Sequence, residues 1–189
     1  MKPILFNVDM VRAILEDRKT VTRRVVKPQP IVIQGRRIEL QTGIDFDWLW
    51  NEGAEEEYIK VPYRPGEILY VRETFFEYKG RFYYKADGKH DALDLLIGSS
   101  FFKWRPSIHM PREAARIFLR VTAVRVERLH YITRDEAVRE GANPALAVDD
   151  FKRIWDSTVK KSDLARYGWD ANPWAWVIEF ERVSKEEAV

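Results

Sequence analysis

Residues 116–129 read R-I-F-L-R-V-T-A-V-R-V-E-R-L and largely alternate between apolar and polar side chains. Successive side chains of a β-strand point to opposite faces, so this alternation predicts one long strand with one buried face. Strand-forming residues recur at 68–76 and at 174–183, which we also expect to be strands. A turn at 78–80 leads into 81–85, and we expect this segment to return as a hairpin against 68–76.

Short helices are predicted between these strands at irregular intervals. Residues 10–15 are amphipathic, and Asp9 is placed to cap them. A capping-box pattern at 133–136 begins a second helix that ends at Gly141, and Asp149 begins a third. Because strand and helix do not alternate regularly, we do not expect a doubly wound parallel sheet. We therefore predict an α+β protein built on a small, partly open β-barrel with short helices at its rim.

The chain is predicted to form a single domain over 1–189, because no linker-like composition marks a boundary. Two stretches, 30–62 and 88–112, are interpreted as insertions in that domain. Within the first, residues 31–40 are expected to form a hairpin, and the acidic residues at 51–57 are expected to lie on the surface.

Composition excludes several classes of function. The 189 residues are 46% hydrophobic and 33% charged, as in ordinary globular proteins, and the net charge of +2 provides no overall field toward nucleic acid or a membrane. Cysteine is absent, which excludes disulfides and thiolate sites, and the three histidines lack metal-ligand spacing. No apolar run is long enough to span a bilayer, and we do not expect the first ten residues to act as a signal peptide. We expect a cytoplasmic protein without a metal, other cofactor or membrane partner.

One short segment could carry chemistry. Residues 18–24 read R-K-T-V-T-R-R, which places Lys19 three residues before Thr22 where a helix passes into a strand. A neutral lysine can take the proton of a threonine hydroxyl and make it a nucleophile. If the segment is extended, Thr22 and Arg24 share one face. Composition alone favours the plainer interpretation, a strand start on the surface with solvated arginines.

Several further motifs accompany this segment in order along nearly the whole chain. They are K-P-I-L-F-N at 2–7, P-G-E-I-L-Y-V-R-E-T-F at 65–75, W-R-P-S-I-H-M-P-R at 104–112, I-T-R-D-E-A-V-R-E-G at 132–141 and N-P-W-A-W-V-I-E-F-E at 172–181. Together with the strand at 117–129, they resemble ASCH-domain proteins. The long form with the motif at 104–112 is similar to versions common in bacteriophages and prophages. The resemblance implies a PUA-like β-barrel, a fold shared with RNA-binding modules.

A bacterial branch of this family removes the acetyl group of N(4)-acetylcytidine with a lysine, a threonine and a glutamate, and its motif is R-K-T-x-T-x-R. The resemblance implies Thr22 as nucleophile, Lys19 as base and Glu140 as the carboxylate. Glu136 is the rival carboxylate, but its capping-box role already accounts for it. Arg24 is a candidate to bind substrate and the oxyanion. This chain is nearly twice as long as that enzyme, so the acyl group and the base do not carry over.

Five other residues are candidates to bind substrate. Arg72 and Glu73 are strand neighbours that point to opposite faces, so at most one of them faces a central pocket, and an ion pair is the alternative role. Trp104, Ser107 and His109 lie in a proline-bounded loop that could line a pocket and stack on a base. The alternative for Trp104 is to plug the open end of the barrel.

The function predicted first is hydrolysis of an N-acyl group on a cytidine, a cytosine or a related modified nucleoside. Its partner is then a small-molecule nucleoside substrate. The alternatives are an RNA-binding module without catalysis, which would use the same cleft with aromatic stacking, and a ribonuclease. Near-neutral net charge favours a small substrate over long RNA.

Overall fold

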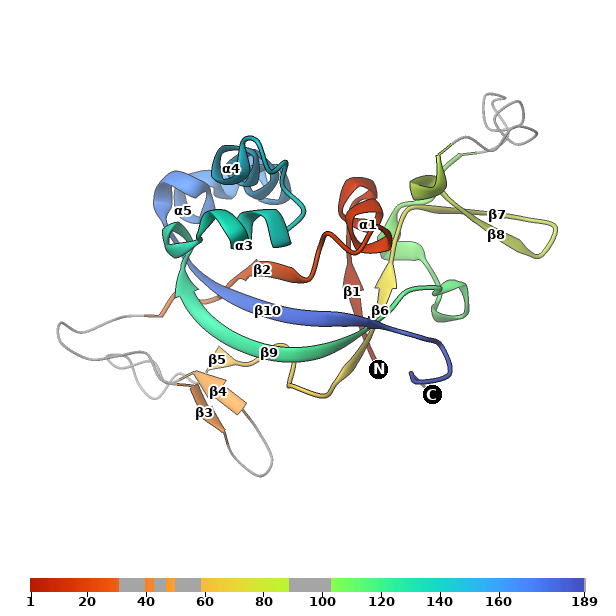
Figure 1. The fold of residues 1–189 in the computed structure, drawn as a ribbon, viewed down its shortest axis with the longest axis horizontal. Helices are drawn as coiled ribbons and strands as arrows, with labels where there is room; N and C mark the ends of the chain where they lie inside the picture. Colours follow the sequence, from red (N-terminus) through yellow and green to blue (C-terminus); the bar gives the residue numbers. More distant parts are fainter. Residues whose placement is uncertain (31–39, 43–46, 50–58, 89–102, 189) are drawn as a thin grey trace. The chain divides into compact units, whose positions relative to one another are not determined.

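The computed structural model describes residues 1–30, 40–42, 47–49, 59–88 and 103–188 (Figure 1). Its strands are β1 (Lys2–Leu5), β2 (Val21–Val25), β3 (Leu40–Thr42), β4 (Asp47–Leu49), β5 (Ile59–Lys60), β6 (Ile68–Arg72), β7 (Phe75–Tyr78), β8 (Arg81–Tyr84), β9 (Phe118–Arg128) and β10 (Trp174–Val183). Its α-helices are α1 (Val8–Leu15), α3 (Arg134–Arg139), α4 (Ala147–Thr158) and α5 (Leu164–Tyr167). Its 3-10 turns are η1 (Lys85–Asp87), η2 (Ser107–His109), η3 (Arg112–Ala114), η4 (Leu129–Tyr131), η5 (Lys161–Asp163) and η6 (Trp169–Ala171).

Strands and helices are both present, which confirms the α+β class. A mixed five-stranded sheet has the order β1-β6-β9-β10-β2, with β1 parallel to β6 and β2 antiparallel to β10. A three-stranded sheet, β3-β4-β5, and the β7-β8 hairpin complete the strands, and within the described ranges no closed barrel is found. The hairpin expected at 31–40 and the acidic stretch at 51–57 lie almost entirely outside the described residues, as does 89–102 of the second expected insertion.

The chain divides into two compact units, and each is assembled from separate stretches. Unit 1 comprises Met1–Lys19, Ile68–Arg120 and Glu181–Val189, and unit 2 comprises Thr20–Glu67 and Val121–Phe180. The segment 18–24 therefore crosses from one unit to the other after Lys19.

In unit 1, β6 lies between β1 and the first residues of β9. Ile4 is opposite Val71 in the parallel pair, Leu69 is opposite Leu119 in the antiparallel pair, and all four side chains are buried. Asn7, rather than the predicted Asp9, caps α1, since its side chain accepts a hydrogen bond from the N–H group of Met10 at 2.9 Å.

The single strand predicted at 68–76 is wrong, because the structure has two strands there. β6 ends at Arg72 and β7 begins at Phe75, where the backbone bonds with Arg105 in both directions (3.2 and 2.8 Å). Past this break, β7 pairs with β8 through the turn at Lys79 and Gly80, whose positive φ angles of 49° and 73° reverse the chain. The predicted hairpin is thus confirmed with a shorter first strand.

In unit 2, β2 pairs with β10 and α3 and α4 pack beside them. The predicted capping box is confirmed, because the Thr133 side chain accepts from the Glu136 N–H group and the Glu136 carboxylate accepts from the Thr133 N–H group. Gly141, with φ of +97°, ends α3 as predicted. α4 begins at Ala147, two residues before the predicted start, and packs Phe151 and Trp155 into the core.

Candidate functional site

Few polar side chains of the described residues are buried. They are Lys19, Thr22, Arg23, Glu73, Glu140 and Asp150. The three residues predicted to be catalytic all belong to this set, with exposed fractions of 2% for Lys19, 1% for Thr22 and 3% for Glu140. Burying a polar group costs free energy unless it is bonded, and buried titratable groups concentrate at functional sites. The expected surface location for this segment is therefore wrong for Lys19 and Thr22.

Strand β2 places Thr22 in unit 2. Thr22 lies opposite Ile178 of β10, and strand geometry directs Thr22 and Arg24 to one face and Arg23 to the other. The residue before β2, Thr20, donates its N–H group to the carbonyl of Arg139 at 2.9 Å, and the Arg139 Nε donates to the Thr20 hydroxyl at 3.1 Å. The start of β2 is thereby fixed against the end of α3, whose next residue is Glu140.

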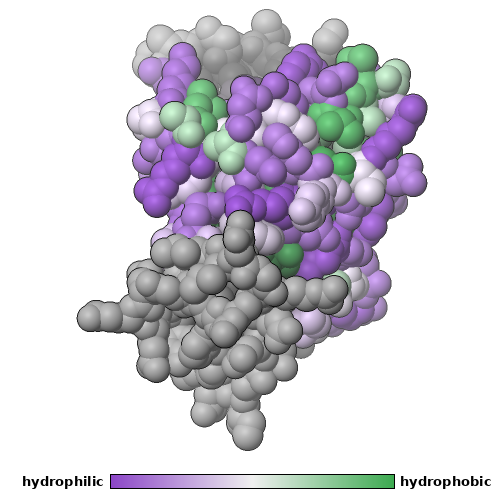
Figure 2. Space-filling model, turned by 90° about the vertical axis from the view of Figure 1, so that its left-hand side faces the viewer, coloured by the Kyte–Doolittle hydropathy of each residue, from purple (hydrophilic) through white to green (hydrophobic). Residues whose placement is uncertain are grey.

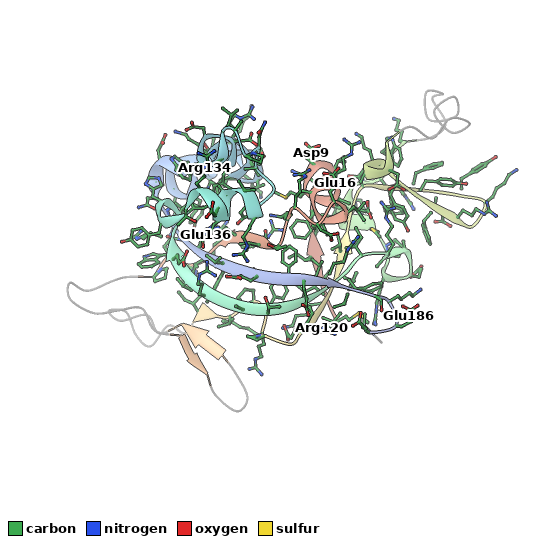
Figure 3. All side chains as sticks on the ribbon, viewed as in Figure 1. Asp9, Glu16, Arg120, Arg134, Glu136 and Glu186 are labelled. Carbon is green, nitrogen blue, oxygen red and sulfur yellow. The ribbon has the colours of Figure 1, made fainter. Side chains whose placement is uncertain are left out.

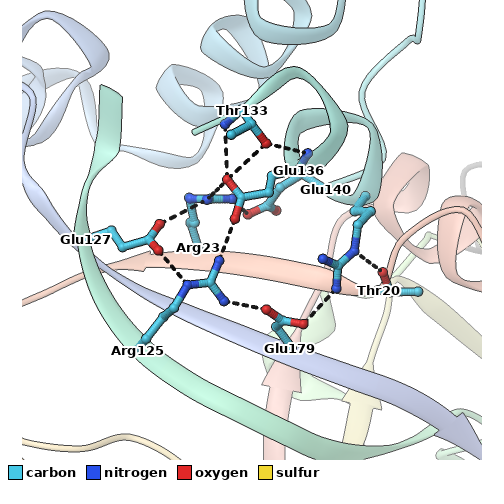
Figure 4. A network of polar contacts seen from close by, with 9 residues as sticks. Thr20, Arg23, Arg125, Glu127, Thr133, Glu136, Glu140 and Glu179 are labelled. Carbon is cyan, nitrogen blue, oxygen red and sulfur yellow. Dashed lines mark hydrogen bonds and ion pairs between the residues drawn. The ribbon is translucent and has the colours of Figure 1, made fainter. Parts of the chain in front are cut away.

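Arg23 connects β2 to three carboxylates (Figure 4). Its side chain is 1% exposed, and it donates to Glu140 at 3.3 Å, to Glu136 at 3.0 Å and to Glu127 at 3.4 Å. Glu140 also acts on the opposite face of the strand. Burial lowers the pKa of Arg24, and the negative charge of Glu140 opposes that shift. One carboxylate therefore influences side chains on both faces of β2.

A second layer of ion pairs surrounds Arg23. Arg125 of β9 contacts Glu127, Glu136 and Glu179, and Arg139 donates to Glu179 at 2.8 Å (Figure 4). Hydrogen bonds from Arg139, and then from Arg125, lower the pKa of Glu179. Sequence reasoning missed this network. Its one available signal was the charged pair at 125 and 127, which alternation places on the otherwise apolar face of the strand.

The two candidate carboxylates differ in burial and in bonding. Figure 3 shows Glu136 on α3 together with Arg134. The Glu136 side chain is 17% exposed, against 3% for Glu140, and it accepts hydrogen bonds from Thr133, Arg23 and Arg125. Burial alone would raise the pKa of Glu136, but the Thr133 N–H group and the charges of Arg23 and Arg125 lower it. Glu136 therefore acts as a structural residue, because it caps α3 and pairs with Arg23 and Arg125.

Lys19 is the last residue of unit 1. Its N–H group donates to the carbonyl of Ala13 at 3.0 Å, which fixes it in the turn after α1, and its Nζ lies 5.6 Å from the ring centroid of Phe6. Three Cα–Cα steps separate it from Thr22, so the two Cα atoms are at most about 11 Å apart.

Arg72 and Glu73, both in unit 1, have separate partners. Arg72 donates to the carbonyl of Met110 at 2.9 Å and to that of Ile108. Glu73 accepts two hydrogen bonds from Arg116, at 2.9 and 3.1 Å. Burial raises the pKa of Glu73, and the bonds from Arg116 oppose that shift. The ion pair weighed as the alternative role of Glu73 is therefore present.

Arg116 is held from three sides. Asp87 accepts from it at 2.9 Å in addition to Glu73, and its guanidinium carbon lies 3.9 Å from the ring centroid of Tyr84. Burial alone would lower the pKa of Arg116, but the bonds to Glu73 and Asp87 raise it.

The remaining three candidates also lie in unit 1. The ring of Trp104 meets that of Phe76 edge-on, with centroids 6.4 Å apart. Ser107 and His109 are the first and last residues of η2, and His109 is exposed. Unit 2 contains Thr22, Arg24 and Glu140, and it is these that the structure brings together through Arg23 and the end of α3.

The described residues provide neither a metal site nor a membrane-spanning helix. Among them, no three histidine, aspartate or glutamate side chains lie close enough to hold a metal ion. None of their helices combines the length and the apolar character that crossing a membrane requires.

Comparison with known proteins identifies no family for this chain. No family model matches the chain, and no curated protein matches it either. A crystal structure of a protein from Enterococcus faecalis V583, described by the family model DUF984, is similar at 10% sequence identity with a TM-score of 0.43. The match covers 97% of this chain and 82% of that protein. A likeness at this level assigns neither a fold nor a function.

Proposed function

We propose that this protein is an amidohydrolase that removes an N-acyl group from an acylated cytidine, a cytosine or a related modified nucleoside. We also propose that its scaffold is the PUA-like fold of ASCH-domain proteins. One observation carries the catalytic proposal. The three residues that the motif resemblance selects, Lys19, Thr22 and Glu140, are each at least 97% removed from solvent.

The position of Glu140 supports its choice as the carboxylate. It is 118 residues from Thr22 in the sequence, yet the bonds between Thr20 and Arg139 fix the end of α3 beside the start of β2. Arg23, the neighbour of Thr22, then holds the Glu140 carboxylate directly. In this proposal, Arg23 is a positioning residue, because it fixes Glu140 and does not itself touch the reacting atoms.

The proposed reaction is a two-step acyl transfer. Lys19, as a neutral amine, takes the proton from the Thr22 hydroxyl, and the oxygen attacks the acyl carbonyl. Arg24 or backbone N–H groups stabilise the oxyanion. The C–N bond breaks, the proton passes from Lys19 to the departing exocyclic amine, and an acyl ester remains on Thr22. Water, positioned by Glu140, hydrolyses the ester and returns the proton to Thr22. Lysine must be uncharged for this role, and burial is the usual way to disfavour its charged form.

The test is an ultraviolet assay with N(4)-acetylcytidine and with bulkier N(4)-acyl cytidines. We expect turnover by the wild type, none by Thr22→Ala, and a loss of at least about a hundredfold in Lys19→Ala. Thr122→Ala is the matched control, because Thr122 is an exposed threonine on β9. Circular dichroism verifies that each variant is folded. Absence of turnover with every acyl form, or equal rates for wild type and Thr22→Ala, would contradict the proposal.

The carboxylate is assigned by a second pair of variants. Glu140→Gln should lower kcat, whereas Glu136→Gln should lower stability and leave kcat of the folded protein within a few-fold of wild type. The opposite pattern would transfer the role to Glu136. If the wild type is inactive but shortens an RNA oligonucleotide, or only binds it, then ribonuclease or RNA binding replaces the hydrolase.

A further inference from the structure

Both cations of helix α4 are paired with carboxylates. Lys152 contacts Asp170 at 3.0 Å, and Arg153 contacts Asp150. Figure 2 shows the side of the molecule that carries α4 and α5, where hydrophilic residues cover most of the coloured surface and hydrophobic ones form small separate patches. Charge that is paired within the protein offers little to a charged partner, so α4 itself does not indicate a binding surface.

The β7-β8 hairpin of unit 1 carries cations that are not paired in this way. Backbone bonds between Phe75 and Arg105 join the segment 103–105 to this hairpin. Residues 75–85 and 103–105 contain one carboxylate, Glu77, and five cations, all of them exposed: Lys79, Arg81, Lys85, Lys103 and Arg105. Within the part of the chain that the structure describes, none of the five forms an ion pair with a carboxylate. The hairpin therefore concentrates positive charge in a chain whose net charge is only +2.

One face of the same hairpin is aromatic. Alternation places Phe76 and Tyr78 on this face, and the strand register sets Tyr83 opposite Phe76. The ring centroid of Phe76 lies 6.4 Å from that of Tyr78, 6.5 Å from that of Tyr83 and 6.4 Å from that of Trp104. Phe76 is buried, and the three rings around it are half-buried. We call these four side chains the aromatic face.

Positive charge borders the aromatic face. Arg81 lies opposite Tyr78 in the register, and the Nζ atom of Lys79 is 5.2 Å from the ring centroid of Tyr78. Glu77 is opposite Phe82, and strand alternation directs both of these side chains to the other face. The one carboxylate of the hairpin therefore points away from the aromatic face, and the cations at the turn lie beside it.

This combination fits a single strand of nucleic acid. Phosphate groups bind lysine and arginine, and unpaired bases stack on aromatic side chains whatever their sequence. RNA is the strand that regularly offers unpaired bases, in loops, bulges and ends.

A lipid membrane is the competing partner, because it also attracts basic and aromatic residues. Insertion needs exposed apolar side chains. The exposed large hydrophobic residues of the described chain all lie outside the hairpin: Met1, Ile108, Tyr131 and Leu146. The turn of the hairpin is formed by Lys79 and Gly80 before Arg81, which are all exposed, so it provides no apolar anchor. The observations therefore favour RNA.

We propose that the β7-β8 hairpin binds single-stranded RNA. The bases stack on the exposed parts of Tyr78, Tyr83 and Trp104, and the phosphates bind the five cations, beginning with Lys79 and Arg81. The proposed catalytic residues are not part of this surface, so this inference does not rest on the proposed function.

The test is fluorescence anisotropy of a labelled single-stranded RNA of about 12 nucleotides, titrated with the full chain at several salt concentrations. Arg81→Gln should weaken binding by at least about threefold and lower the salt slope by about 0.7, the value of one phosphate contact on a single strand. Lys185→Gln is the matched control, because Lys185 is an exposed cation of unit 1 outside the hairpin. It should bind like the wild type.

Stacking is tested with a second pair of variants at Tyr78. Tyr78→Leu removes the ring, so it should weaken binding by at least about fivefold and leave the salt slope unchanged. Tyr78→Phe keeps the ring and should bind within about twofold of the wild type. Circular dichroism verifies that each variant is folded.

Several results would overturn the proposal. The first is absence of RNA binding at low salt, and the second is wild-type affinity in both Arg81→Gln and Tyr78→Leu, which would place the RNA elsewhere. Tighter binding of single-stranded DNA of the same sequence would reject RNA as the partner. Sedimentation with vesicles of phosphatidylserine and phosphatidylcholine, without RNA binding, would assign the surface to a membrane. RNA binding without deacylation of N(4)-acetylcytidine would uphold this surface and reject the hydrolase, and deacylation without RNA binding would do the reverse.

Discussion

Each unit buries an ion-pair centre, and the two centres are built differently. In unit 1, the buried Glu73 takes both of its hydrogen bonds from a single arginine, Arg116, at 2.9 and 3.1 Å. In unit 2, the buried Arg23 divides its bonds among three glutamates at 3.0 to 3.4 Å, and its Nε has none. The first centre is a closed pair, in which one arginine bonds to both oxygens of one carboxylate. The second is a hub, in which one arginine is shared among three carboxylates and its Nε has no partner.

We propose that the difference separates an ion pair that only stabilises the fold from one that also takes part in binding a ligand. The bidentate pair satisfies both oxygens of the Glu73 carboxylate, and Asp87 accepts a further hydrogen bond from Arg116, so these contacts account for Glu73 and Arg116 as part of the fold. Arg23 bonds to its three glutamates at 3.0 to 3.4 Å, and its Nε has no partner. It follows Thr22 in β2 and lines a pocket of about 350 Å³. Incomplete satisfaction of a buried cation is the feature expected where substrate completes the site.

The largest loss of unfolding free energy is expected from replacing Arg23, the arginine of the hub. Arg23→Met leaves Glu140 buried among other carboxylates, and breaking a buried pair in this way costs about 3–5 kcal/mol. Arg23→Lys retains the positive charge, so its loss of unfolding free energy should be clearly smaller. Urea unfolding followed by tryptophan fluorescence measures both. A loss below about 1 kcal/mol for Arg23→Met would show that its three bonds do not hold the network together.

Removing the arginine of the closed pair should lower the free energy of unfolding by less, and a second substitution should restore more of that loss. Arg116→Met is expected to cost about 2 kcal/mol, below the buried-pair range, because the Arg116 side chain is 27% exposed. Adding Glu73→Gln removes the remaining buried charge and should recover most of that loss. In the Arg23→Met background, Glu140→Gln should recover only part, since Glu127 and Glu136 remain. Equal recovery in the two double variants would remove the distinction between pair and hub.

Local patterns predicted much of the fold. The alternation at 116–129, the capping box at 133–136 and the closing strand at 174–183 all appear, because each depends on neighbouring residues alone. The error at 68–76 has a non-local cause. The segment 68–76 contains none of the usual turn residues, so no turn signal marks the break after Arg72, which depends on the pairing of Phe75 with Arg105.

The candidate site was predictable only as a list of residues. The motif resemblance selects Lys19, Thr22 and Glu140, but the role of Arg23 depends on a contact across 117 residues that no local pattern encodes. The pocket of about 350 Å³ beside β2 is still less visible, because its cations come from β2, from Lys27 after that strand and from Lys160 after α4, in a chain of nearly neutral charge. Tertiary structure alone places them together.

The two centres should also respond to pH with opposite signs. The folded-state pKa of Glu136 lies below its usual 4.5, so its contribution to stability is full above that pH and is lost as the pH falls through the lowered value. The pKa of Glu73 is raised above 4.5, so between 4.5 and its raised value the folded state holds the extra proton and stability falls as the pH rises.

The corresponding measurement is urea unfolding between pH 3 and pH 7. The difference in unfolding free energy between wild type and Glu136→Gln should shrink as the pH falls below 4.5. The difference between wild type and Glu73→Gln should shift in favour of the wild type as the pH falls toward 4.5. If the two differences in unfolding free energy change with pH in the same direction, the opposite pKa shifts of Glu136 and Glu73 are contradicted.

The smallest loss of unfolding free energy is expected from replacing Asp87, the exposed carboxylate that also contacts Arg116. Asp87 also accepts from Arg116, but its side chain is 37% exposed, and Arg116 keeps both bonds to Glu73 when Asp87 is replaced. Ion pairs open to water are worth about 0–1 kcal/mol, so Asp87→Asn should lose no more than that in urea unfolding. Glu181→Gln, which breaks an exposed pair with Arg120, provides the reference value. A loss at Asp87 as large as that of Arg116→Met would mean that the fork to Glu73 does not dominate, and Glu73 would then again be available to bind a ligand.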